Sequence, residues 1–445
     1  MSAPSLRVRE VEVFLRHVRT RMVFRYGKAE VTGQPYAHLR VKFDPDVTGV
    51  SAAALPPLWF DKREGLTHEE TIQELLRSIE IASGVYRGGG TDTAYGLHRA
   101  CEPEARRRAA GMNDLTAGFG VALLDAAVVD ATCRMANRTF HQGLREDLFD
   151  FGPVDVSDRP LDRIFVRHTI GLSDPIRAAD VVTRVGDGLP ETLEEVTRAY
   201  RVRYFKVKVS GDVPASRERL RRIAEVLDRE AGDYAVTLDG NEQFHEMEEV
   251  VEFARSTAAD PALTNLWNRT LWIEQPVERS RALEVNVPRG LKPVIIDESD
   301  GTDDAVDRAL ARGYAGISAK NCKGVFRTLH SFRRAAEKRA VLSSEDLMNI
   351  PVVPLHQDLC VAAALGITHS ERNGHHYIRA FEYFSPRERE AALREYPSLY
   401  GGINPPGGII PRLPSVRIVD GALDLREVNT FGFGVRSEPD WDMIK

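Results

Sequence analysis

Five short apolar segments between residues 204 and 320 each end in ionisable or polar residues. They read Phe205-Lys206-Val207-Lys208-Val209, Thr237-Leu238-Asp239-Gly240-Asn241, Trp272-Ile273-Glu274-Gln275-Pro276, Ile295-Ile296-Asp297-Glu298-Ser299 and Ile317-Ser318-Ala319-Lys320-Asn321. Short β-branched runs bounded by polar residues, glycine or proline are typical of buried strands. Amphipathic segments such as 216–230 and 325–338 separate them and predict helices. Strands that alternate with helices in this way predict a parallel sheet, which we expect to close into a barrel.

The position of the ionisable residues is informative because barrels carry their chemistry at the C-terminal ends of the strands. Those ends are predicted to hold Lys208, Asp239, Glu274, Asp297 and Lys320. These five residues are therefore the first candidates for a functional site.

Length and charge limit the class of protein. A chain of 445 residues suffices for two domains, or for one barrel with an addition. With 42% hydrophobic and 28% charged residues, it should form a soluble globule with a substantial core. The formal net charge of -6 gives no electrostatic support for nucleic-acid binding, so we expect no nucleic-acid partner.

Neither the cysteines nor the N-terminus indicates export. Cys101, Cys133, Cys322 and Cys360 are scattered and lack metal-finger spacing, which suits a reducing compartment better than a disulfide framework. Residues 6–21 are rich in arginine instead of forming an apolar signal core, and no uninterrupted apolar run is long enough to span a bilayer. We expect a cytoplasmic protein without a membrane partner.

The order of elements predicts two domains and a tail. Residues 1–150 should form an N-terminal α+β capping domain, with strands followed by helices. Its predicted strands and helices are 11–14, 36–43, 67–82 and 119–135. A linker at 146–160 contains Gly152, Pro153 and Pro160 as breakers. Residues 160–385 should form the barrel.

The last parts of the barrel and the tail follow from weaker patterns. We predict the first, seventh and eighth barrel strands at 163–170, 340–344 and 376–384, and helices at 192–201 and 351–365. Residues 386–445 are expected to return to the capping domain as a tail. Within it, 400–414 is rich in Gly and Pro, and 415–425 predicts a hairpin around Asp420-Gly421 that has no partner in the barrel.

Two lysines occupy one strand at alternate positions. Residues i and i+2 on a strand share a face, so Lys206 and Lys208 should both point into the barrel. Two ammonium groups that lie close together lower each other's pKa, and a lysine near neutrality can act as a general base. Either lysine alone, like Lys320, is more often an ordinary surface residue, and the argument depends on their combination with the carboxylates.

Three carboxylates are predicted at three successive strand ends. If Asp239, Glu274 and Asp297 converge, they repel one another unless a cation lies among them. Oxygen ligands favour a hard divalent cation, and Mg²⁺ commonly keeps coordination positions open for water or substrate. Each carboxylate alone is about equally well explained as the cap of a following helix.

Taken together, these motifs resemble the enolase superfamily, and within it the muconate-lactonizing-enzyme and mandelate-racemase branch. The resemblance rests on Lys206-Val207-Lys208, Asp239-Gly240-Asn241, Glu274-Gln275-Pro276, Asp297-Glu298-Ser299 and Lys320 in this order, and it covers nearly the whole chain. It implies a modified (β/α)7β barrel with a cap built from the N-terminal region and the tail.

The resemblance also implies a chemistry. Asp239, Glu274 and Asp297 would bind Mg²⁺, which holds a substrate carboxylate and stabilises the enediolate formed when the α-proton leaves. Lys208 and Lys320 would be bases on opposite faces of that carbon, with Lys206 tuning Lys208. A divalent cation offsets the developing charge where it appears, which is the largest catalytic effect available to such a reaction.

Two departures from the branch bear on the substrate. The predicted seventh strand ends in Glu345 where mandelate-racemase-type enzymes carry a histidine base, which disfavours most acid-sugar dehydratases. The predicted eighth strand lacks the Asp-x-Asp of dipeptide epimerases and offers Glu382. Glu382 is either an acid that hydrogen bonds to the substrate carboxylate or a buried partner of Arg379.

Residues outside the predicted strand ends complete the candidate site. Arg25 and Tyr26 lie on a loop that the family folds over its active site, and either grip the substrate or form a solvated turn. We include them with Asn241, Glu298 and Glu345 as candidate substrate-binding residues.

The sequence thus predicts a Mg²⁺-dependent enzyme that acts on a small-molecule carboxylate and forms a homo-oligomer. A racemase, epimerase or other isomerase is the first expectation. A dehydratase or cycloisomerase on the same scaffold is one alternative, and a non-catalytic binding protein that kept the barrel is another.

Overall fold

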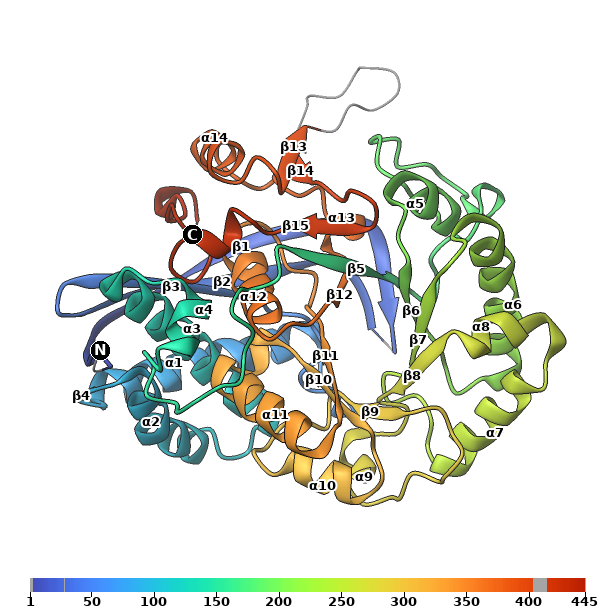
Figure 1. Ribbon diagram of the computed structural model, residues 1–445, viewed down its shortest axis with the longest axis horizontal. Helices are drawn as coiled ribbons and strands as arrows, with labels where there is room; N and C mark the ends of the chain where they lie inside the picture. Colours follow the sequence, from blue (N-terminus) through green and yellow to red (C-terminus); the bar gives the residue numbers. More distant parts are fainter. Residues whose placement is uncertain (1–2, 28, 403–413, 445) are drawn as a thin grey trace.

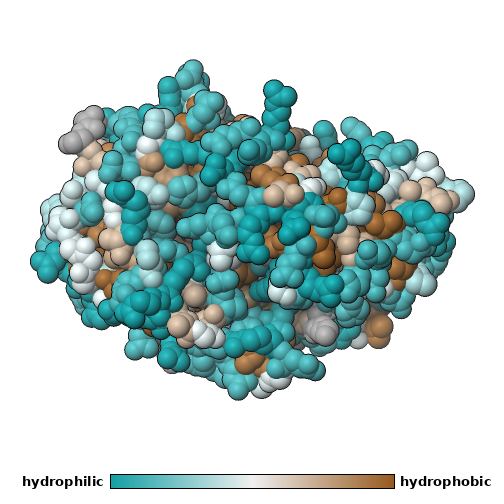
Figure 2. Space-filling view, turned by 90° about the horizontal axis from the view of Figure 1, so that it is seen from below, coloured by the Kyte–Doolittle hydropathy of each residue, from teal (hydrophilic) through white to brown (hydrophobic). Residues whose placement is uncertain are grey.

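The computed structural model describes residues 3–27, 29–402 and 414–444. Figure 1 shows an α+β cap beside a closed barrel, with helices around the outside of the barrel. On the face in Figure 2, hydrophilic residues predominate and the hydrophobic residues are scattered in small groups.

The cap is an antiparallel sheet in the order β3-β2-β1-β4, covered by helices. Its elements are β1 (Leu6–Tyr26), β2 (Ala29–Asp44), β3 (Val47–Ala54), α1 (His68–Gly88), β4 (Thr91–Asp92), α2 (Ala94–Arg108), α3 (Asp114–Ala136) and α4 (Phe140–Arg145). The strands are longer than the sequence pattern predicted because β1 and β2 continue as one hairpin as far as Tyr26 and Ala29.

Helix α3 forms the centre of the cap. Its alanine-rich surface allows β3 to approach so closely that a Cβ on Gly49 would lie 2.0 Å from the carbonyl oxygen of Ala127. The helix is long and apolar enough by composition to cross a membrane, contrary to our reading of the sequence, but its most apolar window is entirely buried in the protein. We therefore interpret α3 as a core helix.

The barrel consists of eight parallel strands, and it closes where β12 pairs with β5. The strands are β5 (Arg163–Ile170), β6 (Tyr204–Lys208), β7 (Ala235–Asp239), β8 (Thr270–Glu274), β9 (Val294–Ile296), β10 (Gly316–Ala319), β11 (Val341–Ser344) and β12 (His369–Arg372). The helices between them are α5 (Leu193–Tyr200), α6 (Val213–Glu230), α7 (Met247–Ala258), α8 (Thr264–Asn268), α9 (Arg279–Ala282), α10 (Ala305–Ala311), α11 (Val325–Lys338) and α12 (Val353–Ala364). The predicted α/β barrel with an α+β cap is confirmed.

Local sequence explains how the outer helices begin and which face they bury. Helix α6 starts where the Asp212 side chain accepts a hydrogen bond from the backbone N–H of Ala215, with Pro214 in its first turn. Its buried residues recur at helical spacing, and include Leu220, Ile223 and Leu227. This apolar stripe packs the helix onto the barrel strands.

The β1–β2 hairpin reaches over the C-terminal ends of the barrel strands. The backbone N–H of Leu172, just after β5, donates to the carbonyl oxygen of Arg25 at 3.1 Å. Arg21 on the same hairpin forms a buried ion pair with Asp187 at 2.7 Å. The cap is thereby fixed where it can close a site at the strand ends.

The segment predicted as the eighth strand, 376–384, is not a strand. The eighth strand is β12, earlier in the chain, and the predicted segment begins within α13 (Gly374–Tyr377) and continues as turns. The aromatic residues of this segment led to the strand prediction, but Phe381 packs against Phe384 and Tyr400 instead of against barrel strands.

The tail contacts both units. Its elements are α14 (Pro386–Glu395), β13 (Tyr400–Gly402), β14 (Pro414–Val416) and β15 (Ala422–Asp424). Most of the Gly/Pro-rich segment 400–414 lies outside the described residues. Strand β15 pairs antiparallel with β5, so the expectation that 415–425 has no partner in the barrel is wrong. Further along, Trp441 packs on Phe14 of β1, which belongs to the cap.

Candidate active site

The three predicted carboxylates lie at the C-terminal ends of the neighbouring strands β7, β8 and β9. Asp239 and Glu274 are 0% exposed and Asp297 is 1% exposed. The strands are neighbours in the sheet, with Asp239 paired to Glu274 across β7 and β8. Their arrangement therefore follows directly from the alternation of strand and helix.

Residues between the carboxylates fix these strand ends. A Cβ on Gly240 would lie 2.7 Å from the Cα of Pro276, so only glycine lets the β7 and β8 ends approach this closely. The Gln275 side-chain oxygen accepts hydrogen bonds from the backbone N–H groups of Asp297 and Ser299, at 2.7 and 3.1 Å. Gln275 thus holds the β9 end beside the β8 end.

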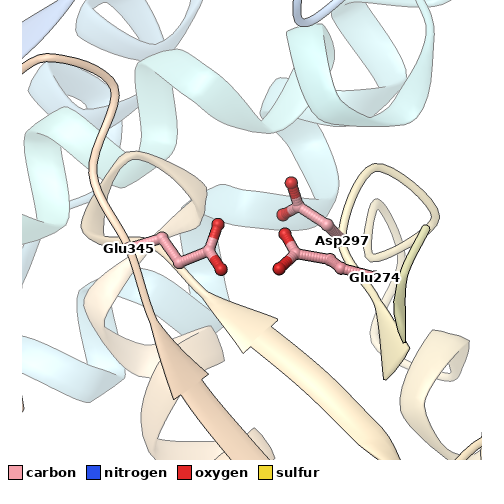
Figure 3. A group of neighbouring side chains, drawn as sticks. All are labelled: Glu274, Asp297 and Glu345. Atoms are coloured by element: carbon pink, nitrogen blue, oxygen red, sulfur yellow. The ribbon is translucent and has the colours of Figure 1, made fainter. Parts of the chain in front are cut away.

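The close cluster of carboxylates contains Glu345, after β11, in place of Asp239, which is bonded to Lys206 and Lys208. Carboxylate oxygens of Glu274, Asp297 and Glu345 all lie within 4.8 Å of one another. Figure 3 shows the three side chains pointing toward one another from their separate strands. Among the described residues this is the one cluster of His, Cys, Asp or Glu that is close enough to hold a metal ion.

Lys206 lies at the centre of the acidic side chains. Its Nζ is 2.8 Å from Asp239, 2.8 Å from Glu274, 2.6 Å from Glu345 and 2.8 Å from Glu371. Burial disfavours its charge, but the surrounding carboxylates outweigh burial and hold its pKa well above the ordinary value. The expectation that two neighbouring ammonium groups bring each other toward neutrality is wrong for Lys206, because four carboxylates outweigh one neighbouring ammonium group.

Lys208 and Lys320 lie on strands that are four places apart in a ring of eight. Lys208 donates to Asp239 at 2.6 Å. Lys320 donates to Asp297 at 2.6 Å and to Glu345 at 2.8 Å. Both lysines line the same pocket, and the ring order places them on opposite sides of the barrel.

The carboxylates differ in their electrostatic surroundings. Burial, together with the nearby Glu345, raises the pKa of Glu274 well above its ordinary value. Burial alone would also raise the pKa of Glu345. The positive charges of Lys206, Lys320 and Arg167 outweigh burial and hold the pKa of Glu345 well below its ordinary value. The site therefore combines a carboxyl group that favours its proton with one that stays ionised.

A pocket opens over these residues. The strand ends contribute Lys206, Lys208, Asp297, Lys320, Glu345 and Glu371. The cap contributes Phe24, Tyr26, Gln34, Pro56 and Trp59, and the segment after β11 contributes Asp346, Leu347 and Met348. The site thus lies between the barrel and the cap.

The other predicted site residues are divided between the pocket and its surroundings. Asn241, Glu345 and Tyr26 line the pocket. Glu298 is buried and accepts hydrogen bonds from Asn241 and Lys62, at 3.1 and 3.0 Å, without lining the pocket. Arg25 is turned away from the site and forms a half-exposed ion pair with Glu30.

Glu382 is not at a strand end, and its assignment to the site is wrong. It is exposed, it lies on a turn after the barrel, and its closest cation is Arg379 at 3.8 Å. The eighth-strand acid is Glu371 on β12, which is buried and bonds to Lys206 at 2.8 Å. The sequence signal that marks β12 is the short run His369 to Arg372 between a helix and a glycine, but the run is too polar to be identified by hydrophobicity.

Two groups of buried charges at the site were not foreseen. Arg167 on β5 donates to Glu345 at 2.9 Å and to the Ser343 hydroxyl at 2.7 Å. Arg372 on β12 donates to Asp346 at 2.6 Å and to Asp358. Burial raises the pKa of Asp346 to about 7 despite Arg372. No local pattern identifies these residues because their partners are distant in the chain.

The residues present fit a hard divalent cation. The ligand atoms that they offer are all carboxylate oxygens, which Mg²⁺ prefers. Oε2 of Glu274 is buried and accepts no hydrogen bond from the described residues. Such an oxygen is expensive to bury unless it has a partner, and a cation among these carboxylates would provide one.

Comparison with family models and with curated proteins gives no match. Solved structures do match. A dipeptide epimerase from Enterococcus faecalis V583, solved with Mg and the dipeptide L-Leu-L-Tyr, superposes with a TM-score of 0.66 at 14% identity, covering 97% of this chain and 100% of that one. A muconate lactonizing enzyme from Pseudomonas fluorescens, complexed with muconolactone, has a TM-score of 0.63 at 15% identity, covering 98% of both chains.

A third match is an enolase from Bradyrhizobium complexed with magnesium and mandelic acid. Its TM-score is 0.66 at 15% identity, and the alignment covers 100% of this chain and 98% of that one. The fold of this chain is thus the fold of the mandelate-racemase and muconate-lactonizing branch, over nearly its full length. At the level of the fold, the resemblance found in the sequence is confirmed.

Proposed function

We propose that this protein is a Mg²⁺-dependent enzyme of the enolase superfamily that removes the α-proton of a carboxylate substrate. The observation that carries the proposal is the set of buried carboxylates at successive strand ends, with a lysine on either side in one pocket. The three solved structures described above support it, since two of them contain magnesium and all three contain carboxylate compounds or their lactone.

Glu274, Asp297 and Glu345 form the close carboxylate cluster that would hold the cation. Asp239, which the resemblance also assigns to the cation, is bonded to Lys206 and Lys208 in this structure and would have to exchange these partners to join it. When bound, Mg²⁺ supplies positive charge that offsets the charge developing on the substrate carboxylate as its α-proton leaves. Gln275 keeps Asp297 in position through the hydrogen bond at 2.7 Å. The cap closes the pocket from the other side and limits the access of water.

Lys208 and Lys320 would move the proton. They come from strands half a ring apart. A carbon held between them can therefore lose a proton to the amine of one lysine and regain a proton from the ammonium group of the other. That arrangement favours racemisation or epimerisation. Elimination and cycloisomerisation use the same first step, and they differ in the product.

The test is α-proton exchange in D₂O, followed by NMR across a library of carboxylic acids in the presence of Mg²⁺. We expect exchange with at least one acid, loss of exchange on chelation, and a fall of about 10²- to 10⁴-fold in Lys208→Ala and in Lys320→Ala. Lys338→Ala, at an exposed position on α11, is the control and should keep full exchange.

The product distinguishes the reaction. Deuterium in the inverted enantiomer indicates a two-base racemase, whereas an unsaturated, keto or lactone product indicates elimination or cycloisomerisation. Full exchange by Lys320→Ala would contradict the opposed-lysine arrangement. A homo-oligomeric state and a cytoplasmic location remain predictions.

A further inference from the structure

The wall of the pocket opposite the strand ends is apolar. Phe24, Tyr26 and Trp59 come from the cap, and Leu347 and Met348 come from the segment after β11. Trp59 lies nearest to the chemistry, since its ring centroid is 5.2 Å from the Nζ of Lys320. A substituent on a carbon held beside Lys320 would therefore meet this wall, which we call the aromatic roof.

Two donors on and beside the roof, the Tyr26 hydroxyl and the side-chain nitrogen of Gln34, have partners within the protein. The Tyr26 hydroxyl donates to the carbonyl oxygen of Pro57 at 3.0 Å. Nε2 of Gln34 donates to the Tyr36 hydroxyl at 2.9 Å and to the carbonyl oxygen of Leu347 at 3.3 Å. Four oxygens of the pocket lining are buried without a partner among the described residues: Oε1 of Gln34 and Oδ1 of Asn241, Asp346 and Asn373. The roof itself thus suits an apolar group, whereas hydroxyl groups of a ligand can find acceptors elsewhere in the pocket.

No cation of the described lining is free to pair with a second negative charge. The lining contains three cations, Lys206, Lys208 and Lys320, and each one is bonded to carboxylates of the barrel. The two further acids of the lining, Asp346 and Glu371, add negative charge. A second carboxylate on a substrate would lose its hydration without gaining a partner.

We propose that the substrate is a monocarboxylate whose α-carbon carries an apolar or aromatic substituent, and that the aromatic roof selects it against dicarboxylates. The proposal rests on the function proposed above, because it assumes that the carboxylate of the ligand lies at the strand ends.

The direct test compares two acids of equal length. 2-Hydroxyhexanoate and 2-hydroxyadipate share six carbons and the same α-carbon, and they differ in a terminal methyl against a terminal carboxylate. Calorimetric titration of the Mg²⁺-loaded protein should show that 2-hydroxyhexanoate binds at least about 10-fold more tightly than 2-hydroxyadipate, because desolvating an unpaired charge is costly. The phenyl analogue, 2-hydroxy-4-phenylbutanoate, should bind at least as well as 2-hydroxyhexanoate.

One variant should reverse the selectivity. Leu347 is a partly exposed residue of the roof, so Leu347→Arg adds a cation to the pocket without burying it in the hydrophobic core. It should improve the binding of 2-hydroxyadipate about 10-fold relative to 2-hydroxyhexanoate, which is the effect of pairing the new arginine with the second carboxylate in a partly desolvated site. Leu393→Arg, on an exposed position of α14, is the matched control and should change neither affinity.

The two readouts separate the two proposals. If 2-hydroxyadipate binds the wild-type protein as tightly as 2-hydroxyhexanoate, the roof does not select its ligand and the inference is overturned, whatever the exchange experiment shows. If 2-hydroxyhexanoate is preferred and Leu347→Arg shifts the preference, the inference is supported. If that preference is found but no acid of the library exchanges its α-proton, the selectivity stands and the catalytic proposal falls.

Discussion

Removing the Lys206 ammonium group should make the fold dependent on a divalent cation. Lys206 is 1% exposed and bonds to four carboxylates at 2.6 to 2.8 Å. In Lys206→Met the chain keeps a side chain of similar length but loses the charge. The carboxylates then repel one another at close range in a buried place, unless another cation joins them.

The size of the effect follows from these contacts. Removing one partner of a buried ion pair costs about 3–5 kcal/mol, and the four bonds at Lys206 place it at the upper end of that range. Saturating Mg²⁺ at about 100 times its Kd returns about 2.7 kcal/mol to a protein that binds it only when folded. Since the variant also lacks an ammonium group that competes with the cation, its Mg²⁺ affinity should rise about 10-fold, which adds about 1.4 kcal/mol.

Chemical denaturation with and without Mg²⁺ measures the effect. The wild-type protein should gain less stability from Mg²⁺ than Lys206→Met does, and the variant should approach the wild-type stability only with the cation. Arg21→Met is the control, because the Arg21 side chain is also buried but pairs with Asp187 at 2.7 Å, outside the strand-end carboxylates. It should lose stability with little rescue by Mg²⁺.

Two results would refute this reasoning. Equal gains from Mg²⁺ in the wild-type protein and in Lys206→Met would show that the cation and the ammonium group do not share the carboxylates. A Lys206→Met protein that is as stable as the wild type without Mg²⁺ would show that the carboxylates adapt at little cost, for example by taking up protons.

Three further predictions concern other residues. Glu371→Gln should lower α-proton exchange about 10²-fold or more, because it changes an acid within the pocket, whereas Glu382→Gln on the exposed turn should stay within about twofold; exchange rates in D₂O measure both. Burial lowers the pKa of His356 to about 4, below the value of about 6.5 in the unfolded chain, so this residue leaves the stability unchanged above about pH 6.5 and lowers it as the pH falls toward 4. Urea unfolding should therefore show about 2 kcal/mol less stability at pH 5 than at pH 7 from this residue, and His356→Gln should remove that difference. Asp297→Asn should abolish calorimetric Mg²⁺ binding, whereas Asp358→Asn should leave it intact.

The strand-end residues were predictable because strand and helix alternate clearly around them. Lys206, Lys208, Asp239 and Glu274 follow apolar runs whose period indicates buried strands, and parallel strands bring their C-terminal ends to one edge. The pattern failed at β12 for a physical reason. Its residues His369 to Arg372 are buried yet mostly polar, since their partners are charged groups of the barrel interior. Hydrophobicity therefore favoured the aromatic segment that follows.

The aromatic roof was not predictable from the sequence. Phe24, Trp59 and Leu347 are far apart in the chain, and they meet because the hairpin extends over the barrel. Arg25 and Tyr26 are neighbours on that hairpin, but strand geometry turns the first outward and the second inward. The alternation is visible in the sequence, whereas the face that looks into the pocket is set by the packing of the cap.

The charge balance of the site gives the cation a role in binding as well as in catalysis. The carboxylates at the centre of the barrel are Asp239, Glu274, Asp297, Glu345 and Glu371, and the cations bonded to them are Lys206, Lys208, Lys320, Lys323 and Arg167. These lysine and arginine side chains are thus taken up by the carboxylates and leave no surplus positive charge for a substrate carboxylate. A divalent cation would supply that charge, so substrate and Mg²⁺ should each strengthen the binding of the other, as linkage requires.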